Sequence, residues 1–257
     1  MATFDKSRLR NTLRKLRAVE AQLAGDYDPL ETGQEMLDLL AVLDGLKPVF
    51  LHGRGLVDAP WMTGVVDLAR SLGLRVIQGP CWNPLPPGES FPAWYAECVG
   101  AEFDRHHPFY ICKAPSVARE VAAVNDAGGH PTIGQEARLL GYPECCVAAH
   151  HARAGIYHRY VIERMERLAG GDEARARALY GRDIDLSPES DADEAALAVA
   201  LDIVPCPFGS WNACVSCVDE EESPSIVLSD EYEGLAEAID PALAELLRPR
   251  EEDQPAI

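Results

Sequence analysis

Two neighbouring cysteines, Cys145 and Cys146, stand where thiolate chemistry is favoured. They follow Pro143, and proline suits the first helical position because its missing N–H has no helical partner there. The apolar pattern that follows predicts a helix over 143–169. Free N–H groups at a helix start favour the thiolate, the form that binds metals and attacks electrophiles. The alternative reading is two small buried apolar side chains.

Three more cysteines follow, one alone and two as a CxxC pair. A CxxC pair is well suited to a metal, because both of its sulfurs can reach one ion without distorting the backbone. A thiolate-rich set suits an iron–sulfur cluster, or zinc held by four cysteines or by cysteines with His150 or His151. The predicted cofactor is therefore an iron–sulfur cluster or zinc. The predicted ligands are Cys145, Cys146, Cys206, Cys214 and Cys217.

Alternating strand and helix patterns predict an α/β fold with a small parallel sheet. Strands are expected over 48–52, 74–77 and 109–112. In such a sheet the carboxyl ends of the strands meet at one edge, where ligands bind. The groups that follow these strands are His52, Arg54, Cys81, Cys112 and Lys113. They would face the thiols if the helical half packs over that edge; otherwise they only shape turns or pack against helices.

The candidate catalytic residues are three of these groups and the carboxylate that precedes the thiols. They are His52, Arg54, Lys113 and Glu144. Glu144 could act as a general base beside Cys145, or it could simply complement the positive start of the helix. His150 and His151 are the other side chains that could bind a metal or carry a proton.

The remaining patterns are mostly helical. Helices are expected over 7–24, from a capping box at Thr32 to Gly45, over 58–72, from about 90, from Ser116 to Gly128, over 172–181, near 190–200, and in a last segment capped by Ser229. The chain divides into a helical pair at 1–46, an α/β region at 47–130, a mostly helical Cys-rich region at 131–248 packed on the sheet, and a disordered acidic tail at 249–257.

Charge is distributed unevenly along the chain. The net charge is −19, and residues 219–257 hold thirteen acidic residues against Arg248 and Arg250. Such an acidic chain argues against general nucleic-acid binding, which depends on neutralising phosphates. We expect no membrane span, because no run of eighteen apolar residues occurs. Eight cysteines without a secretory leader indicate the reducing cytoplasm. The expected partner is a small-molecule substrate, and the sequence does not predict the oligomeric state.

Two resemblances follow from the cysteine motifs. The peptide Gly141-Tyr142-Pro143-x-Cys145-Cys146, with Pro205-Cys206 downstream, resembles the domain-of-unknown-function family 483. This resemblance covers the chain from about Phe109 to the last helix and implies importance for those three cysteines, with no assigned activity. A lone Cys112, the CC pair and the CxxC also resemble the CCG-type iron–sulfur domains of heterodisulfide reductases, although Val147 replaces the glycine after the pair.

Three hypotheses for function remain open. The first is an enzyme that uses a thiolate-held iron–sulfur cluster or metal for redox or sulfur-transfer chemistry. The second is a zinc-binding scaffold module, which predicts four ligands and no adjacent pocket. The third is a metal-free enzyme in which Cys145 or Cys146 is the nucleophile or redox thiol.

Overall fold

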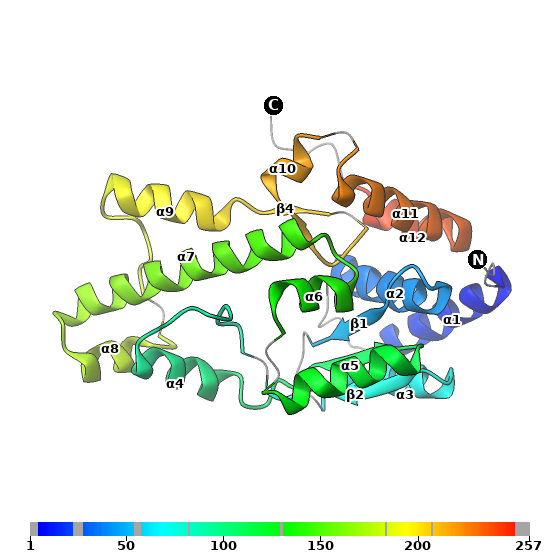
Figure 1. Cartoon of the computed structure of the whole chain (residues 1–257), viewed down its shortest axis with the longest axis horizontal. Helices are drawn as coiled ribbons and strands as arrows, with labels where there is room; N and C mark the ends of the chain where they lie inside the picture. The colour runs from blue at the N-terminus through cyan, green and yellow to red at the C-terminus, as the bar shows by residue number, and fades with distance from the viewer. Residues whose placement is uncertain are drawn as a thin grey trace.

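Helix α7 (Glu144–Ala169) joins two groups of elements in this computed structural model (Figure 1). The structure describes residues 5–22, 28–53, 58–81, 83–128, 131–182, 184–206, 208–220 and 222–249. The first group contains the sheet and the helices α1 (Lys6–Glu20), α2 (Pro29–Asp44), α3 (Pro60–Ser71), α5 (Pro115–Asp126), α6 (Ile133–Leu140), α11 (Pro224–Ile239) and α12 (Pro241–Leu247). The second contains α4 (Ala93–Glu102), α8 (Glu173–Leu179) and α9 (Asp191–Leu201).

The main sheet has three strands, β1 (Val49–His52), β2 (Arg75–Gln78) and β3 (Phe109–Cys112), in the order β1-β3-β2. The mixture of helix and sheet agrees with the predicted class, but the predicted parallel sheet is wrong. The central strand β3 runs antiparallel to both neighbours, with Phe109 opposite His52 and Gln78. The chain between β2 and β3 passes through α4 in the second group and re-enters the sheet at the end where β2 leaves it, since Phe109 pairs with Gln78. Alternation of strands and helices does not determine this reversal.

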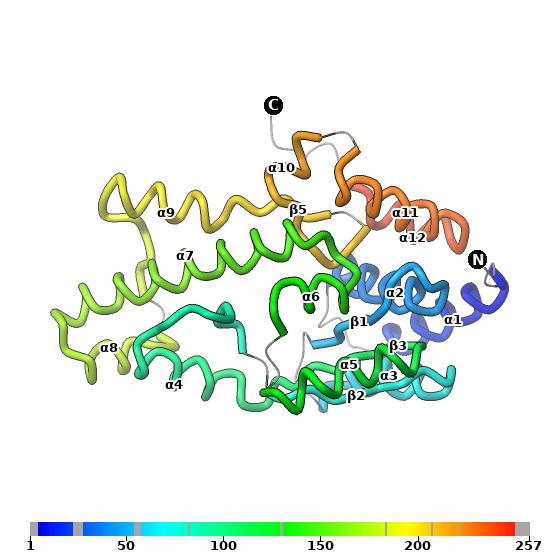
Figure 2. The backbone as a smooth tube through the Cα atoms, viewed as in Figure 1, coloured from blue at the N-terminus to red at the C-terminus, as the bar shows by residue number. Residues whose placement is uncertain are grey.

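Two hydrophobic cores lie along α7. The larger core gathers α1, α2, α3, α11 and α12 against the sheet and includes Cys146 at the start of α7. The second packs α4 and α8 against the later part of α7, around Tyr160 and Met165. The tube in Figure 2 shows α7 starting beside β5 (Asn212–Ala213) and ending beside α8. The same helix therefore belongs to both cores.

Several helix boundaries differ from the predicted ones because another residue provides the cap. Helix α2 begins at Pro29 with Asp28 as its N-cap, so Thr32 lies inside the helix. The predicted end is confirmed, since Gly45 follows with a φ of 95°. Helix α11 is capped by Ser223 rather than Ser229. Helix α6 was not predicted, although Thr132 and Gln135 form a capping box there.

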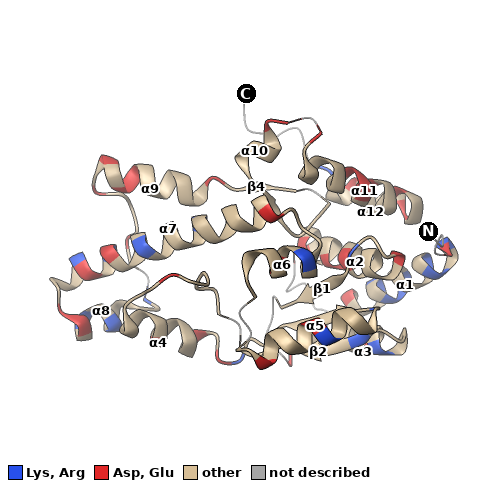
Figure 3. Cartoon of the chain, in the orientation of Figure 1, with Lys and Arg blue, Asp and Glu red and all other residues tan. Residues whose placement is uncertain are grey.

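The basic helix α1 docks on an acidic part of the same chain (Figure 3). The guanidinium of Arg10 donates to the carbonyl oxygens of Ala238 and Ile239, at 3.0 and 3.1 Å. Arg17 lies 2.7 Å from Asp240. Cations at a helix C-terminus are favourable because the last carbonyls have no helical partner. These contacts hold part of the positive charge of α1 against the end of α11.

Within the described ranges, no helix combines the length and the apolar character that crossing a membrane requires. The division into four regions stays a prediction; the larger core draws residues from three of them. The end of the predicted tail, residues 250–257, lies outside the described part of the chain.

Candidate metal centre and adjoining pocket

Four of the five predicted ligands lie together. The sulfur atoms of Cys145, Cys146, Cys214 and Cys217 are all within 4.8 Å of one another. The Sγ of Cys217 is 3.5 Å from that of Cys145 and 3.7 Å from that of Cys146, and the last two are 3.9 Å apart. Cys145 is exposed and the other three are buried. Cys206 is buried nearby, but it is not a member of this set.

The turn before α7 positions the first two thiols. Helix α6 ends at Gly141, whose φ of 76° suits glycine. A Cβ there would lie 2.8 Å from Pro48 Cδ, so glycine also permits close packing against the start of β1. Pro143 is the N-cap of α7 rather than its first helical residue, and the amides of Cys146 and Val147 donate to its carbonyl. The prediction of both thiols in the first turn of a helix is confirmed.

A short hairpin positions the other two thiols. Strands β4 (Val204–Pro205) and β5 pair antiparallel, and Trp211 lies in the chain between them. Gly209 lies against the Trp211 ring so closely that a Cβ would overlap it. Cys214 is the N-cap of the one-turn helix α10 (Val215–Val218), which carries Cys217. The CxxC pair is therefore displayed on a tight turn, with both sulfurs facing α7.

Polar hydrogens surround the sulfur atoms. The amide of Cys214 donates to Cys146 Sγ at 3.3 Å, and Ser225 Oγ is 3.0 Å from the same sulfur. The amide of Ser225, in the first turn of α11, donates to the sulfur of Cys217. Trp211 Nε1 donates to Ser225 Oγ at 3.2 Å and fixes that hydroxyl. Such donors stabilise thiolates and orient them toward a metal.

The thiols differ in acidity before any metal binds. Partial removal of its sulfur from water, followed by its hydrogen bond to Cys217, raises the pKa of Cys145 to about 12. Burial also raises the pKa of Cys146. Burial acts in the same direction on Cys217, but donation from Cys145, from the Ser225 amide and from the other thiols outweighs it and lowers the pKa to about 7. The expected low pKa at the helix start is therefore wrong, and Cys217 is the thiol that ionises most readily.

The distances between sulfurs suit one ion. A zinc–sulfur bond is about 2.3 Å, so four thiolates at the corners of a tetrahedron lie about 3.8 Å apart. The distances of 3.5, 3.7 and 3.9 Å bracket that value. An iron–sulfur cluster places several iron and sulfide atoms between its thiolates, which must then lie farther apart. This spacing would fit a single tetrahedral ion.

A pocket of about 500 Å³ adjoins the thiols. Cys146 forms part of its wall, together with Tyr142, Trp211, His150 and Glu136. Ligand pockets commonly have volumes of about 300–1,000 Å³ and a mainly apolar lining with a few polar groups. Burial lowers the pKa of His150, and neighbouring His151 adds to that effect. His151 itself lies 2.8 Å from Glu136.

Among the described strand-end groups, His52, Cys112 and Lys113 lie away from this pocket. His52 is fully buried on the other face of the sheet, 3.4 Å from Glu35, while Leu51 faces the pocket. Lys113 and Cys112 lie at the opposite edge because β3 is antiparallel, and Lys113 donates to the carbonyl of Leu43. Arg54 lies outside the described residues.

Glu144 and Cys81 occupy other places. The Glu144 carboxylate lies beside α6, where a Cβ on Gly134 would be 3.6 Å from both of its oxygens. Cys81 lines a second, smaller cavity beside the pocket, and His150 lines both. The catalytic roles of His52, Arg54, Lys113 and Glu144 stay predictions.

A buried polar network that was not predicted from the sequence lies beneath the pocket. Lys47 Nζ lies 2.8 Å from Asp38 Oδ1, and each side chain is only 1% exposed. The Tyr142 hydroxyl accepts from Lys47 at 2.5 Å and lies 2.5 Å from Ser210 Oγ, which donates to Asp38. The only available signal was a lysine and an aspartate within apolar surroundings, which usually marks a pair.

No protein-family model, curated protein or solved structure matches this chain. The two resemblances given by the cysteine motifs stay predictions.

Proposed function

We propose that the protein binds one metal ion, zinc or iron, through Cys145, Cys146, Cys214 and Cys217. The observation that carries the proposal is the close grouping of these four sulfurs, all within 4.8 Å of one another. They come from a helix start and from a CxxC turn about seventy residues later, so the ion would fasten two distant segments. Such a link contributes to folding, because the unfolded chain has no preformed site.

We further propose that the centre serves a small-molecule site. Cys146 is at once a ligand of the proposed ion and part of the wall of the 500 Å³ pocket. This arrangement supports an enzyme more than a scaffold module, for which a closed ligand shell would have no pocket beside it. With iron, the chemistry would be electron transfer to or from the bound molecule. With zinc, the ion would fix the shape of the pocket wall.

Metal analysis tests the proposal. The full-length protein is purified without oxygen or chelators, and its zinc, iron and acid-labile sulfide are measured together with the visible spectrum. We expect one ion per chain and no labile sulfide. Cobalt added to the metal-free protein should give the visible absorption of a tetrahedral thiolate site. Labile sulfide with iron would instead favour the cluster, and no metal at all would leave the metal-free thiol enzyme.

Single Cys→Ser variants identify the ligands. Cys146→Ser or Cys217→Ser should reduce the bound metal at least tenfold, because each removes one of four thiolates. Cys206→Ser is the matched control, since Cys206 is also buried and lies in the same hairpin but outside the set. Cys98→Ser is a distant control in α4. Full metal content in Cys146→Ser, or its loss in Cys206→Ser, would contradict the proposed ligand set.

A further inference from the structure

The antiparallel sheet brings a second cysteine against a histidine. The last pair of the β2–β3 ladder is Gln78 with Phe109, and the ladder continues through the amide of Gly79, which donates to the Pro108 carbonyl at 2.7 Å. A Cβ on Gly79 would lie 2.8 Å from the Tyr110 ring. Only glycine permits this approach without a shift of the neighbours. The chain after β2 therefore runs beside the chain before β3.

Cys81 and His107 face each other across these two segments. Cys81 Sγ lies 3.5 Å from His107 Nε2, and His107 Nδ1 lies 3.1 Å from the carbonyl oxygen of Gly79. A carbonyl only accepts hydrogen bonds, so Nδ1 carries the hydrogen in the neutral ring. The lone pair is then on Nε2 and points to the thiol. A nucleophile, a base and a group that orients the base are thus in line.

The thiol has a second acceptor. Cys81 Sγ is 3.2 Å from the carbonyl oxygen of Asp104. Rotation about the Cβ–Sγ bond moves the hydrogen from this oxygen to His107 Nε2. Transfer of the proton to the imidazole frees the sulfur as a thiolate. The Asp104 carbonyl therefore holds the resting thiol, and His107 is the group that can remove its proton.

The cavity beside Cys81 limits what can reach the sulfur. It has a volume of about 110 Å³ and a largely apolar wall that includes Leu51, Leu139 and Leu140, with Glu136, His150 and His151 also lining it. A cavity of roughly 150 Å³ accepts benzene, so only a smaller apolar group fits here. Cys81 itself is exposed, so the group that departs from a reacting ester would lie in solvent. A short acyl chain satisfies both conditions.

We propose that Cys81 is a nucleophile that accepts a short acyl group from a thioester or activated ester, with His107 as its general base. His107 Nε2 takes the thiol proton, and the sulfur forms a bond to the acyl carbon. The bond from that carbon to the leaving sulfur or oxygen breaks, and His107 returns the proton to the leaving group. The products are the Cys81 thioester and a free thiol or alcohol. This site does not depend on the metal centre.

The test uses p-nitrophenyl acetate with the full-length, metal-loaded protein. Release of nitrophenolate is followed from pH 5 to 9, and mass spectrometry of peptides locates each acetyl group. We expect acetylation at Cys81, with a pH midpoint below that of Cys98, because His107 removes the proton of Cys81. Cys98, on α4, is the reference thiol in the same protein. Acetylation of Cys81 with the same pH midpoint as Cys98 would overturn the proposal.

Two further comparisons separate the base from the structure. His107→Asn keeps a donor for the Gly79 carbonyl but has no basic nitrogen facing Cys81. It should reduce the rate at pH 7 at least tenfold and move the pH midpoint toward that of Cys98. An unchanged rate and pH midpoint would overturn the role of His107. If this variant does not fold, the pH profile of wild-type Cys81 compared with Cys98 tests that role instead. The octanoyl ester should react at least tenfold more slowly than acetate; equal rates would overturn the assignment of a short acyl group.

Discussion

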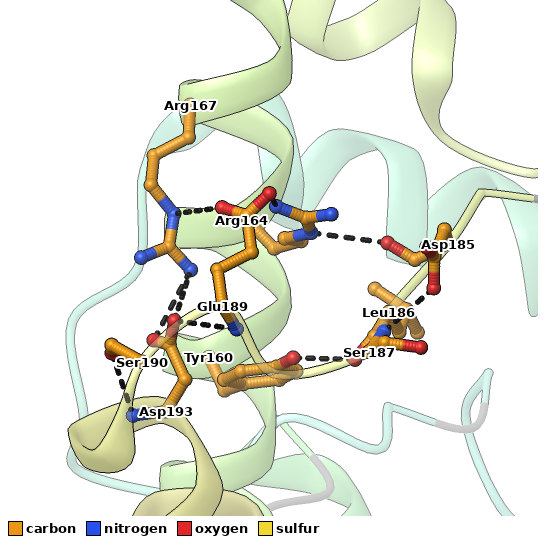
Figure 4. Close-up of polar contacts among 9 residues, drawn as sticks. All are labelled: Tyr160, Arg164, Arg167, Asp185, Leu186, Ser187, Glu189, Ser190 and Asp193. Carbon is orange, nitrogen blue, oxygen red and sulfur yellow. Dashed lines mark hydrogen bonds and ion pairs between the residues drawn. The ribbon is translucent and has the colours of Figure 1, made fainter.

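The two ends of helix α7 carry different kinds of polar group. Near its C-terminal end, Arg164 faces Glu189, which precedes α9, and Arg167 faces Asp193 in the first turn of α9 (Figure 4). The Tyr160 hydroxyl donates to the Leu186 carbonyl beside them. At the N-terminal end, Cys145 and Cys146 face two further thiols from the CxxC turn. One end brings opposite charges together, and the other gathers groups that become negative when they ionise.

This difference indicates which interactions stabilise each end of α7. Arginine and carboxylate groups complement each other, so the C-terminal end of α7 is held by the chain itself. Four thiols make only weak contacts, and as thiolates they repel one another. A bound cation converts that repulsion into the strongest link of the region. We therefore expect chelators to act on the thiol end, and pH to act on the charged end.

Metal removal should produce the largest difference between the two ends. At a free metal concentration a thousand times the Kd, binding stabilises the folded state by about 4 kcal/mol. A chelator should therefore speed amide exchange of 144–147 and 214–218 at least tenfold and leave 160–169 unchanged. Hydrogen exchange with mass spectrometry measures both in one sample. Equal acceleration at both ends would show that α7 opens as one unit.

The next largest effect concerns the buried ion pair below the pocket. Asp38→Asn removes the charge that faces Lys47, and Lys47 is almost fully buried. Removing one partner of a buried pair costs about 3–5 kcal/mol. We expect about 3 kcal/mol, the low end of that range, because the amide can still accept from the Tyr232 hydroxyl. Urea unfolding measures this loss.

Asp67→Asn is the control for this prediction. Asp67 forms an exposed pair with Arg70 on α3, and such pairs contribute little. The unfolding free energy should therefore stay close to that of the wild type. A similar loss of unfolding free energy in both variants would mean that burial of the Lys47–Asp38 pair does not account for its contribution to stability.

Ser225→Ala should weaken metal binding without removing a ligand. The Ser225 hydroxyl lies 3.0 Å from Cys146 Sγ. Loss of a group that supports a metal ligand typically costs 10–100-fold in affinity. Competition with a coloured chelator gives the ratio. Ser71→Ala, which removes a hydroxyl bonded to a helix carbonyl in α3, is the control and should bind metal as the wild type does. No change in Ser225→Ala would mean that backbone amides alone support the thiolates.

The local parts of the candidate site could be predicted from the sequence. Proline before a CC pair predicts thiols at a helix start, and CxxC predicts two sulfurs on one turn; both patterns act over a few residues. Which thiols meet could not be predicted, because it depends on the direction in which the β4–β5 hairpin faces α7. Cys206 follows β4, whereas Cys214 follows β5 and begins α10. Ser225 gave no signal, since a serine at a helix start usually has a capping role.

The sheet shows the same limit. Strand positions follow from short apolar runs, and β1 and β3 lie where those runs predict. Strand direction depends on the path of the chain between β2 and β3, which carries α4 into the second core. Because β3 is antiparallel to β1, His52 pairs with Phe109 at one end of the sheet. Lys113 follows Cys112, which pairs with Val49 at the other end. The same reversal places Cys81 beside His107. The error in direction therefore accounts both for the separation of Lys113 from His52 and for a pair that was not predicted from the sequence.

The smallest predicted effect is a pH dependence of the charged end. The hydrogen bond from Arg167 is the main cause that lowers the pKa of Asp193, although burial opposes it. A carboxyl whose pKa is lower in the folded state stabilises that state above its unfolded pKa, about 3.9. This stabilisation is lost as the pH falls through the still lower folded value. The melting temperature of the wild type should therefore exceed that of Asp193→Asn at pH 7, and the difference should shrink toward zero near pH 2.

A second variant separates the ion pair from the helix start. Asp191 is exposed in the same first turn of α9, so Asp191→Asn loses the favourable interaction with the helix dipole but leaves the Arg167 contact in place. Its pH dependence should be weaker than that of Asp193→Asn. An equal pH dependence of the melting temperature in the two variants would assign the effect to the helix dipole. It would show that the Arg167–Asp193 ion pair does not cause it. A chelator should leave the Asp193→Asn difference unchanged, because the thiols lie at the other end of the helix.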